Sequence, residues 1–260
     1  MSSVCLYFNV HQPFLLKSFS SMDIDVRHTY FDMEACKAAI HEKADRCYLP
    51  CNKIMTRLIN KNRGRFRVRF SISGTTMELL QLYRPDVIDS FRKLVNTGLI
   101  EILAAPYYHS LSFLYSRKEF QRQLSKHQKL VKKIFGIHTT IFNNTALLHN
   151  NELSKYIAGA GFKGMLCEGN VNPIDPVNMP VPELNLLKKI YALENLVLNS
   201  GCEKTIDTWG CLQSLDHFEA RESFQSFSNI VTDFEITLIR QSIEKLKKQS
   251  ALRPVRTPLL

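Results

Sequence analysis

Apolar residues form short runs along this chain, and these runs alternate with longer segments in which apolar side chains recur at helical spacing. The short runs are rich in β-branched, aromatic and leucine residues, and several lack strict alternation with polar residues. Such runs are typical of strands buried on both faces of a parallel sheet. Five strands are predicted, at residues 4–10, 66–73, 99–104, 139–143 and 164–167.

Helical patterns lie between these runs, and the strongest covers residues 118–135, with one apolar face and one basic, glutamine-rich face. The others are predicted at residues 35–60, with a break at Pro50, and at 77–83, 87–95 and 151–160. Strands that alternate with helices favour a parallel sheet with right-handed crossovers. No phosphate-binding glycine motif follows a strand, so an α/β barrel is favoured over a nucleotide-binding sheet.

Beyond residue 170 the pattern weakens. Residues 170–183 contain four prolines and are predicted to form a loop, and a sixth strand is predicted within residues 188–198. Helices are expected at residues 214–230 and 234–248. We therefore expect one domain over residues 1–250, followed by an unpatterned tail at 251–260.

Composition narrows the class of protein. With 45% hydrophobic residues the chain is too apolar to be disordered, and no run approaches the roughly 20 apolar residues of a membrane helix. The net charge of +10 arises in residues 1–150, which hold 22 basic and 11 acidic side chains. These charges fall mainly on predicted outer helices and loops, and no nucleic-acid-reading motif is present. Binding to nucleic acid is therefore not expected.

The seven cysteines and the N-terminus bear on the compartment. An odd number of cysteines and a start without signal-peptide features favour reduced thiols in the cytoplasm. Cys47 and Cys51 have no second closely spaced pair, so they do not predict a zinc site. The sequence leaves the oligomeric state open.

Polar and aromatic residues follow the predicted strands. His11 and Gln12 end the first strand, Tyr107, Tyr108 and His109 follow the third, residues 143–146 end the fourth, and Glu168 ends the fifth. In a parallel barrel these strand ends converge on one mouth. Aromatic faces and hydrogen-bonding side chains in one mouth suit a sugar.

The same segments resemble glycoside hydrolase family 57, in its α-amylase-like branch. The resemblance runs from about residue 4 to residue 169 and fades over 170–250. The segments that carry it are VCLYFNVHQP (4–13), FRVRFSISG (66–74), YRPDVIDSF (83–91), GLIEILAAPYYHS (98–110) and GFKGMLCEG (161–169).

The resemblance implies a seven-stranded β/α barrel that acts on α-glucans by a retaining mechanism, with a glutamate nucleophile on the fourth strand and an aspartate acid/base. Because the chain is short for that architecture, we expect an incomplete or degenerate barrel. Where the α-amylase branch reads Asn-Thr-Glu, this chain reads Asn144-Thr145-Ala146, so the nucleophile position is vacated. Asp216, in LDHFE (215–219), is a weak match to the acid/base.

The resemblance also implies an α-glucan or maltooligosaccharide as partner and no cofactor. Its expected contacts to substrate come from six residues, namely His11, Gln12, Glu101, Tyr108, His109 and Glu168. Glu101 is alternatively a structural partner of an arginine, or orients His109. Metal ligation is not expected, because Pro13 stands where related metal-dependent barrels carry a carboxylate.

Three functions stay open at this point. The first is an α-amylase-like protein that keeps its glucan pocket and has little or no hydrolysis. The second is an active hydrolase that uses another carboxylate, such as Glu168. The third is a non-catalytic binding or regulatory protein for α-glucans.

Overall fold

The computed structural model describes residues 6–62, 64–167, 179–219 and 223–251. All five predicted strands are confirmed. The last four are one to three residues shorter than predicted, and the first two residues predicted for the first strand lie outside the described residues. They are β1 (Leu6–Val10), β2 (Val68–Ile72), β3 (Ile100–Ile102), β4 (Ile141–Asn143) and β5 (Gly164–Leu166).

The strands pair in parallel throughout. The order is β1-β2-β3 in one sheet and β4-β5 in a second, and a parallel bridge between Ala104 and Phe142 connects the two. The described strands are thus parallel, as predicted, and they are short, within a chain that is mostly helical. Over the described residues the arrangement is open, with β1 and β5 at its two edges, so the seven-stranded barrel stays a prediction.

Helices follow each of the first four strands, close to their predicted positions. They are α1 (Met33–Lys43), a π-helical turn (Ala44–Tyr48), α2 (Leu49–Lys61), α3 (Gly74–Tyr83), α4 (Pro85–Val95), α5 (Ser112–Tyr115), α6 (Arg117–Phe135) and α7 (Asn151–Gly159). Short 3₁₀ turns lie at Ser21–Asp23 and Thr145–Leu147. The break predicted at Pro50 is wrong, because the helix continues past this residue. The π-helical turn ends directly before α2, so Pro50 lies in the first turn of α2. A proline is tolerated there, since its missing N–H would have no partner within the helix.

In the described residues, the elements of the C-terminal part are all helices, apart from a single bridge residue, Ser214. This part contains α8 (Val181–Ala192), α9 (Glu194–Ser200), α10 (Glu203–Leu212), α11 (Asp216–Glu219) and α12 (Phe224–Ala251). The sixth strand predicted at 188–198 is wrong. Its apolar side chains instead form the buried face of a helix pair, with Leu187, Ile190 and Tyr191 at helical spacing in the core.

The helices expected at 214–230 and 234–248 correspond to α11 and to one long helix, α12. Most of the predicted proline-rich loop and of the predicted tail lies outside the described residues.

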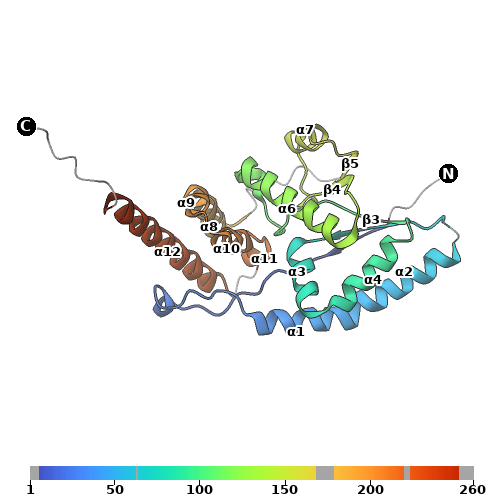
Figure 1. The fold of residues 1–260 in the computed structure, drawn as a ribbon, viewed down its shortest axis with the longest axis horizontal. Helices are drawn as coiled ribbons and strands as arrows, with labels where there is room; N and C mark the ends of the chain where they lie inside the picture. Colours follow the sequence, from blue (N-terminus) through green and yellow to red (C-terminus); the bar gives the residue numbers. More distant parts are fainter. Residues whose placement is uncertain (1–5, 63, 168–178, 220–222, 252–260) are drawn as a thin grey trace, which may run out of the picture.

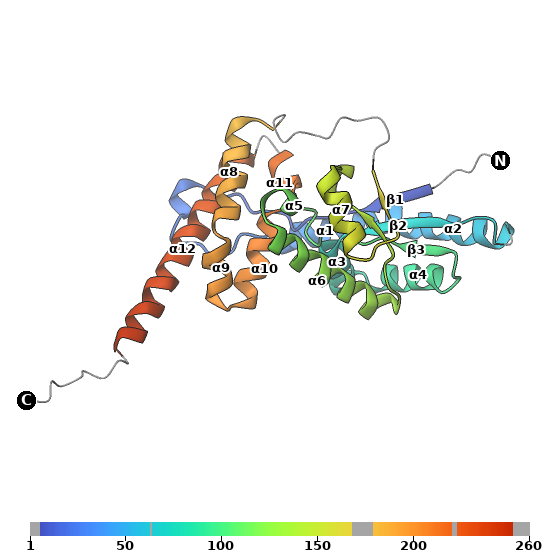
Figure 2. The same ribbon diagram turned by 90° about the horizontal axis from the view of Figure 1, so that it is seen from above.

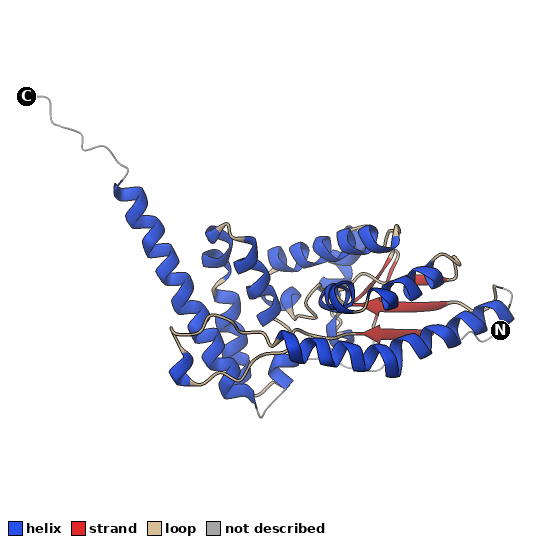
Figure 3. Cartoon of the chain, turned by 60° about the horizontal axis from the view of Figure 1, so that its bottom comes forward, coloured by secondary structure: helices blue, strands red, loops and turns tan. Residues whose placement is uncertain are grey.

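Figures 1 and 2 show α8–α12 gathered at one end of the molecule, with α12 extending away from the rest. In Figure 3 the arrows of β1 and β2 point toward this helical end, so the carboxyl ends of the strands face the C-terminal helices. We call residues 6–166 the sheet region and residues 181–251 the helical region.

The molecule has two large apolar clusters, one in the sheet region and one in the helical region, and the second also includes Phe19, Tyr30 and Leu111 of the sheet region. Phe70, Ile72 and Phe91 lie in the core of the sheet region, whereas Trp209 and Ile230 lie in that of the helical region. The Trp209 indole is fully buried and donates a hydrogen bond to the Ile190 carbonyl. Across the described residues, no helix combines the length and apolar character needed to cross a membrane.

Candidate functional site

Two histidines and one carboxylate meet where the two regions touch. His11 follows β1, His109 lies in the loop after β3, and Asp216 opens α11. The Asp216 Oδ2 atom is 2.8 Å from His11 Nε2 and 3.3 Å from His109 Nδ1, and it accepts a hydrogen bond from Ser214 Oγ at 2.8 Å. The two imidazole rings are 4.1 Å apart. We call His11, His109 and Asp216 the triad. Its members are all predicted site residues, and the structure brings them together.

His11 is held by the strand ends around it. Its Nδ1 atom lies 2.7 Å from Ser73 Oγ, and Ser73 is the N-cap of α3, directly after β2. The backbone of Gln12 is fixed on both sides, because its N–H donates to Thr76 and its carbonyl accepts from Thr75. Since β1 and β2 pair in register up to Val10 and Ile72, the residues that follow them must lie side by side.

His109 takes an uncommon backbone conformation with φ 56°. A left-handed conformation is unfavourable for a residue with a Cβ atom and persists where the surroundings fix it. Here the His109 carbonyl accepts from the Leu215 N–H, and Ser110 forms an antiparallel bridge with Ser214. These backbone contacts fix the distance between His109 and Asp216.

The electrostatics of the triad favour an ionised carboxylate. Burial alone would raise the pKa of Asp216. The hydrogen bonds and charges of His109 and His11 outweigh this effect and hold the pKa of Asp216 far below its ordinary value. Burial lowers the pKa of His11 below its ordinary value, opposed by its bond to Asp216. A carboxyl group with such a low pKa accepts hydrogen bonds well but is a poor general acid near neutral pH.

The triad also has the composition of a metal site. One ring nitrogen from each histidine and one carboxylate oxygen of Asp216 all lie within 4.8 Å of one another. Two imidazoles and a carboxylate suit zinc and other divalent transition metals.

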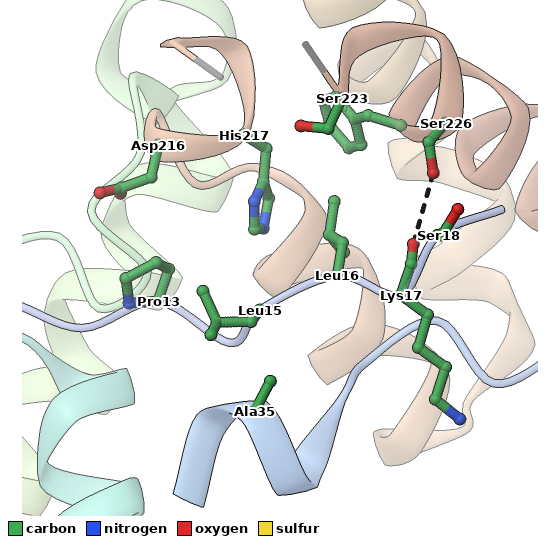
Figure 4. Close-up of a pocket in the computed structure, with 11 residues that line it drawn as sticks. Pro13, Leu15, Leu16, Lys17, Ser18, Ala35, Asp216, His217, Ser223 and Ser226 are labelled. Atoms are coloured by element: carbon green, nitrogen blue, oxygen red, sulfur yellow. Dashed lines mark hydrogen bonds between the residues drawn. The ribbon is translucent and has the colours of Figure 1, made fainter. Parts of the chain in front are cut away.

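A pocket of about 470 Å³ opens beside Asp216. Its walls come from the chain after β1, from α1 and from the helical region, as Figure 4 shows. In that view Asp216 lies at the Pro13 side of the pocket, and the His217 ring is directed toward the segment that carries Leu15 and Leu16. Its lining combines apolar residues, such as Leu15, Leu16 and Phe227, with serines and with the charged residues Lys17 and Asp216. Such a mixture can hold a ring that presents hydroxyl groups.

Other predicted site residues have structural partners. Glu101 pairs with Arg69 on the neighbouring strand at 2.8 Å and accepts a hydrogen bond from Thr140, so its predicted sugar contact stays a prediction. Tyr108 is fully buried, and its hydroxyl contacts Asp207 and Lys126, which leaves the ring no exposed face. The Gln12 side chain is buried and bonds to the Pro13 carbonyl.

Ala146 lies in the turn after β4, with an exposed side chain and φ 52°. Next to it, Asn144 is buried and donates to the Leu148 carbonyl, while Asn143 donates to Ser71 Oγ on β2. Glu168 lies outside the described residues. The assignment of Ala146 to the nucleophile position stays a prediction from the resemblance.

Sequence reasoning missed Ser73 and Ser214, which bond to the triad. The convergence of strand ends, which predicts His11 as a site residue, also applies to Ser73, because Ser73 ends the second predicted strand. Ser214 carried no such signal, because its position depends on the helical region.

Comparison with known proteins agrees with the resemblance. The model of glycosyl hydrolase family 57 matches residues 5–235. A curated protein of Methanocaldococcus jannaschii named "Putative alpha-amylase" is 35% identical over 164 residues, which is 62% of this chain and 35% of that protein. The match thus spans about a third of the length of this relative.

Two solved structures are similar at lower identity. A 4-alpha-glucanotransferase from Thermococcus litoralis is 19% identical with a TM-score of 0.48, over 63% of this chain and 22% of that one. The alpha-amylase AmyC from Thermotoga maritima is 15% identical with a TM-score of 0.45, over 62% and 38%. Because the family model covers most of the sequence, this chain belongs to glycosyl hydrolase family 57.

Proposed function

We propose that this chain binds an α-glucan or maltooligosaccharide at the triad and the adjoining pocket, and that it has little or no retaining hydrolysis. The observation that carries the proposal is that residue 146, in the turn after β4, is an alanine, and we assign this position to the nucleophile on the resemblance. In this proposal the five described strands belong to an incomplete seven-stranded barrel, and their carboxyl ends form its mouth.

The chemistry of the site supports binding better than turnover. A retaining mechanism needs one carboxylate to attack the anomeric carbon and a second carboxyl group to protonate the leaving oxygen, roughly 5–5.5 Å away. An alanine at position 146 cannot attack. Asp216, ionised and bonded to two imidazoles, cannot donate a proton at neutral pH but can accept hydrogen bonds from sugar hydroxyls.

The family and its named relatives supply the substrate class. The curated relative at 35% identity is named "Putative alpha-amylase", and the family is one of glycosyl hydrolases.

The direct test is calorimetric titration of the full chain with maltoheptaose, with cellohexaose as the β-linked control. We expect binding of the α-glucan only, weakened by His11→Ala and Asp216→Asn. His28→Ala is the matched control, since His28 also faces an aspartate, Asp233, but lies outside the triad. Equal binding by the triad variants and the control would contradict the proposed site.

Turnover is tested separately with a reducing-end assay on amylose, with and without azide. Azide can form a bond to the anomeric carbon while the glycosidic C–O bond breaks, so it replaces a missing carboxylate nucleophile. We expect negligible release without azide. Turnover near the ordinary enzyme value of about 10 s⁻¹ would overturn the proposal, and its loss in Glu168→Gln would favour the second hypothesis.

A further inference from the structure

The triad offers three ligand atoms of the type that divalent transition metals prefer, and neither sugar binding nor hydrolysis requires this property. Two of the ligands are imidazole nitrogens and the third is a carboxylate oxygen. Zinc sites with three protein ligands of this kind leave a fourth position for water. We propose that His11, His109 and Asp216 form a binding site for a divalent transition-metal ion such as Zn²⁺.

The two distances to Asp216 are close to those that a metal needs, and the two histidine nitrogens lie within 4.8 Å of each other. Ligand bonds of about 2.0–2.1 Å at tetrahedral angles place ligand atoms roughly 3.3 Å apart. His109 Nδ1 and Asp216 Oδ2 are 3.3 Å apart, whereas the 2.8 Å between His11 Nε2 and Asp216 Oδ2 is a hydrogen-bond distance. A metal ion would replace the proton in that bond and separate the two atoms by about 0.5 Å.

The surroundings fix the orientation of the ligands. A histidine that binds a metal usually bonds through its other ring nitrogen to a fixed partner. His11 has such a partner in Ser73, whose hydroxyl is itself held at the N-cap of α3 and bonded to Thr75 and Thr76. The hydrogen bond from the Leu215 N–H to the His109 carbonyl holds the second imidazole against Asp216.

The triad is also reachable from solvent. The side chain of His11 is 8% exposed, that of His109 22% and that of Asp216 33%. The pocket beside Asp216 gives a fourth ligand room to approach. Sequence reasoning excluded a metal because Pro13 offers no carboxylate, but the fold brings a carboxylate from 205 residues further along the chain.

The test uses the full chain after treatment with a chelator and alkylation of accessible thiols, titrated calorimetrically with Zn²⁺. We expect one equivalent to bind, and His109→Ala and Asp216→Asn to weaken binding at least about 10-fold, since even the loss of an outer partner has an effect of this size. His28→Ala should bind as the wild type does. No saturable binding by the wild type, or equal binding by the triad variants, would overturn the proposal.

A second readout does not depend on the variants. Co²⁺ bound to two imidazoles and a carboxylate should give visible absorption without a thiolate-to-metal band, and Zn²⁺ should raise the unfolding temperature of the wild type. A Co²⁺ spectrum with a thiolate band would assign the metal to cysteine and contradict the triad. No carbohydrate is present, so this test succeeds or fails independently of the proposed glucan binding.

Discussion

The sheet region and the helical region build their interiors from the same apolar residue types, but the contact between them adds buried hydrogen bonds to apolar packing. Phe19, Tyr30 and Leu111 of the sheet region lie in the same apolar cluster as Trp209 and Phe227. Within each region the core is a cluster of aliphatic and aromatic side chains. Between the regions, buried hydrogen bonds join Glu119 and Gln123 to Gln213, and Tyr30 to Asp233. The triad belongs to this contact, with two members from the sheet region and one from the helical region.

This difference shows where the site is vulnerable. Apolar cores tolerate moderate rearrangement, whereas a buried polar group that loses its partner is destabilising. The geometry of the triad therefore depends on the buried hydrogen bonds between the regions as well as on the apolar packing between them.

The largest effect is expected for Glu119→Ala. The Glu119 side chain is fully buried on α6 and accepts hydrogen bonds from Arg122, Gln123 and Gln213. Its removal leaves the guanidinium of Arg122 without its partner, which should lower the free energy of unfolding by about 3–5 kcal/mol, measured by urea denaturation.

Glu42→Ala is the matched control for that variant. Glu42 pairs with Arg46 on the exposed face of the first long helix. Removal of an exposed pair should change the free energy of unfolding by less than about 1 kcal/mol. Similar losses in the free energy of unfolding for the two variants would mean that the buried hydrogen bonds between the regions stabilise the fold no more than an exposed ion pair does.

The next effect comes from Gly210→Ala. A Cβ atom at Gly210 would lie 2.3 Å from Tyr108 Cε2, so α10 could approach the loop after β3 only with a shift. We expect a loss of about 1–3 kcal/mol in the free energy of unfolding, reduced by the better helix propensity of alanine. Because Tyr108 precedes His109, glucan binding should weaken as well.

Gly159→Ala is the matched control, for which we expect stabilisation in place of destabilisation. Gly159 is also helical, but a Cβ atom there meets nothing within 4 Å. This variant should stabilise the chain by up to about 1 kcal/mol through helix propensity alone. If both variants are stabilising, close contact between α10 and Tyr108 is not a property of the protein in solution.

A pH experiment asks whether the two regions unfold together. Burial lowers the pKa of His127, in the sheet region, and of His217, in the helical region, to about 4. Between about pH 6.5 and 4 the unfolded chain therefore binds more protons than the folded chain, so stability is full above this window and falls as the pH decreases through it. From pH 7 to 5.5 each histidine should contribute a loss of about 1 kcal/mol.

His127→Gln and His217→Gln should each reduce this pH dependence, measured by urea unfolding at the two pH values. If the regions form one cooperative unit, both variants alter the same transition. Two transitions, each altered by one variant only, would show that the polar contact between the regions is weak. A variant that keeps the full dependence would show that its histidine is not buried as a neutral ring.

The sequence predicts the sheet region well because its signals are local. Short apolar runs mark the strands, and Gly136, with φ 72°, ends α6 where it was expected to. In the helical region, the apolar run around Ile190 predicts a strand, although its length and apolar content suit a strand and a buried helix equally. Only the packing of α8 and α9 against α12 decides between them.

The site residues also differ in how well the sequence predicts them. His11 and His109 were selected because strand ends converge, a rule that depends on local pattern and sheet topology alone. The partner Asp216 was only weakly matched, since its position depends on a contact across more than a hundred residues. The structural roles of Glu101 and Tyr108 also depend on cross-strand and interhelical partners that no local pattern specifies.

The smallest effect on stability, and the most selective effect on the site, is expected for Ser73→Ala. Ser73 caps α3 and also contacts His11, whereas Asn150 caps α7 without touching the triad. Each alanine variant should lower the free energy of unfolding by about 1 kcal/mol through loss of an N-cap. Only Ser73→Ala should weaken maltoheptaose binding, because it frees the His11 ring to rotate away from Asp216. Equal binding by the two variants, measured by calorimetry at matched stability, would show that the helical region alone orients His11 and that the strand end after β2 has no part in the site.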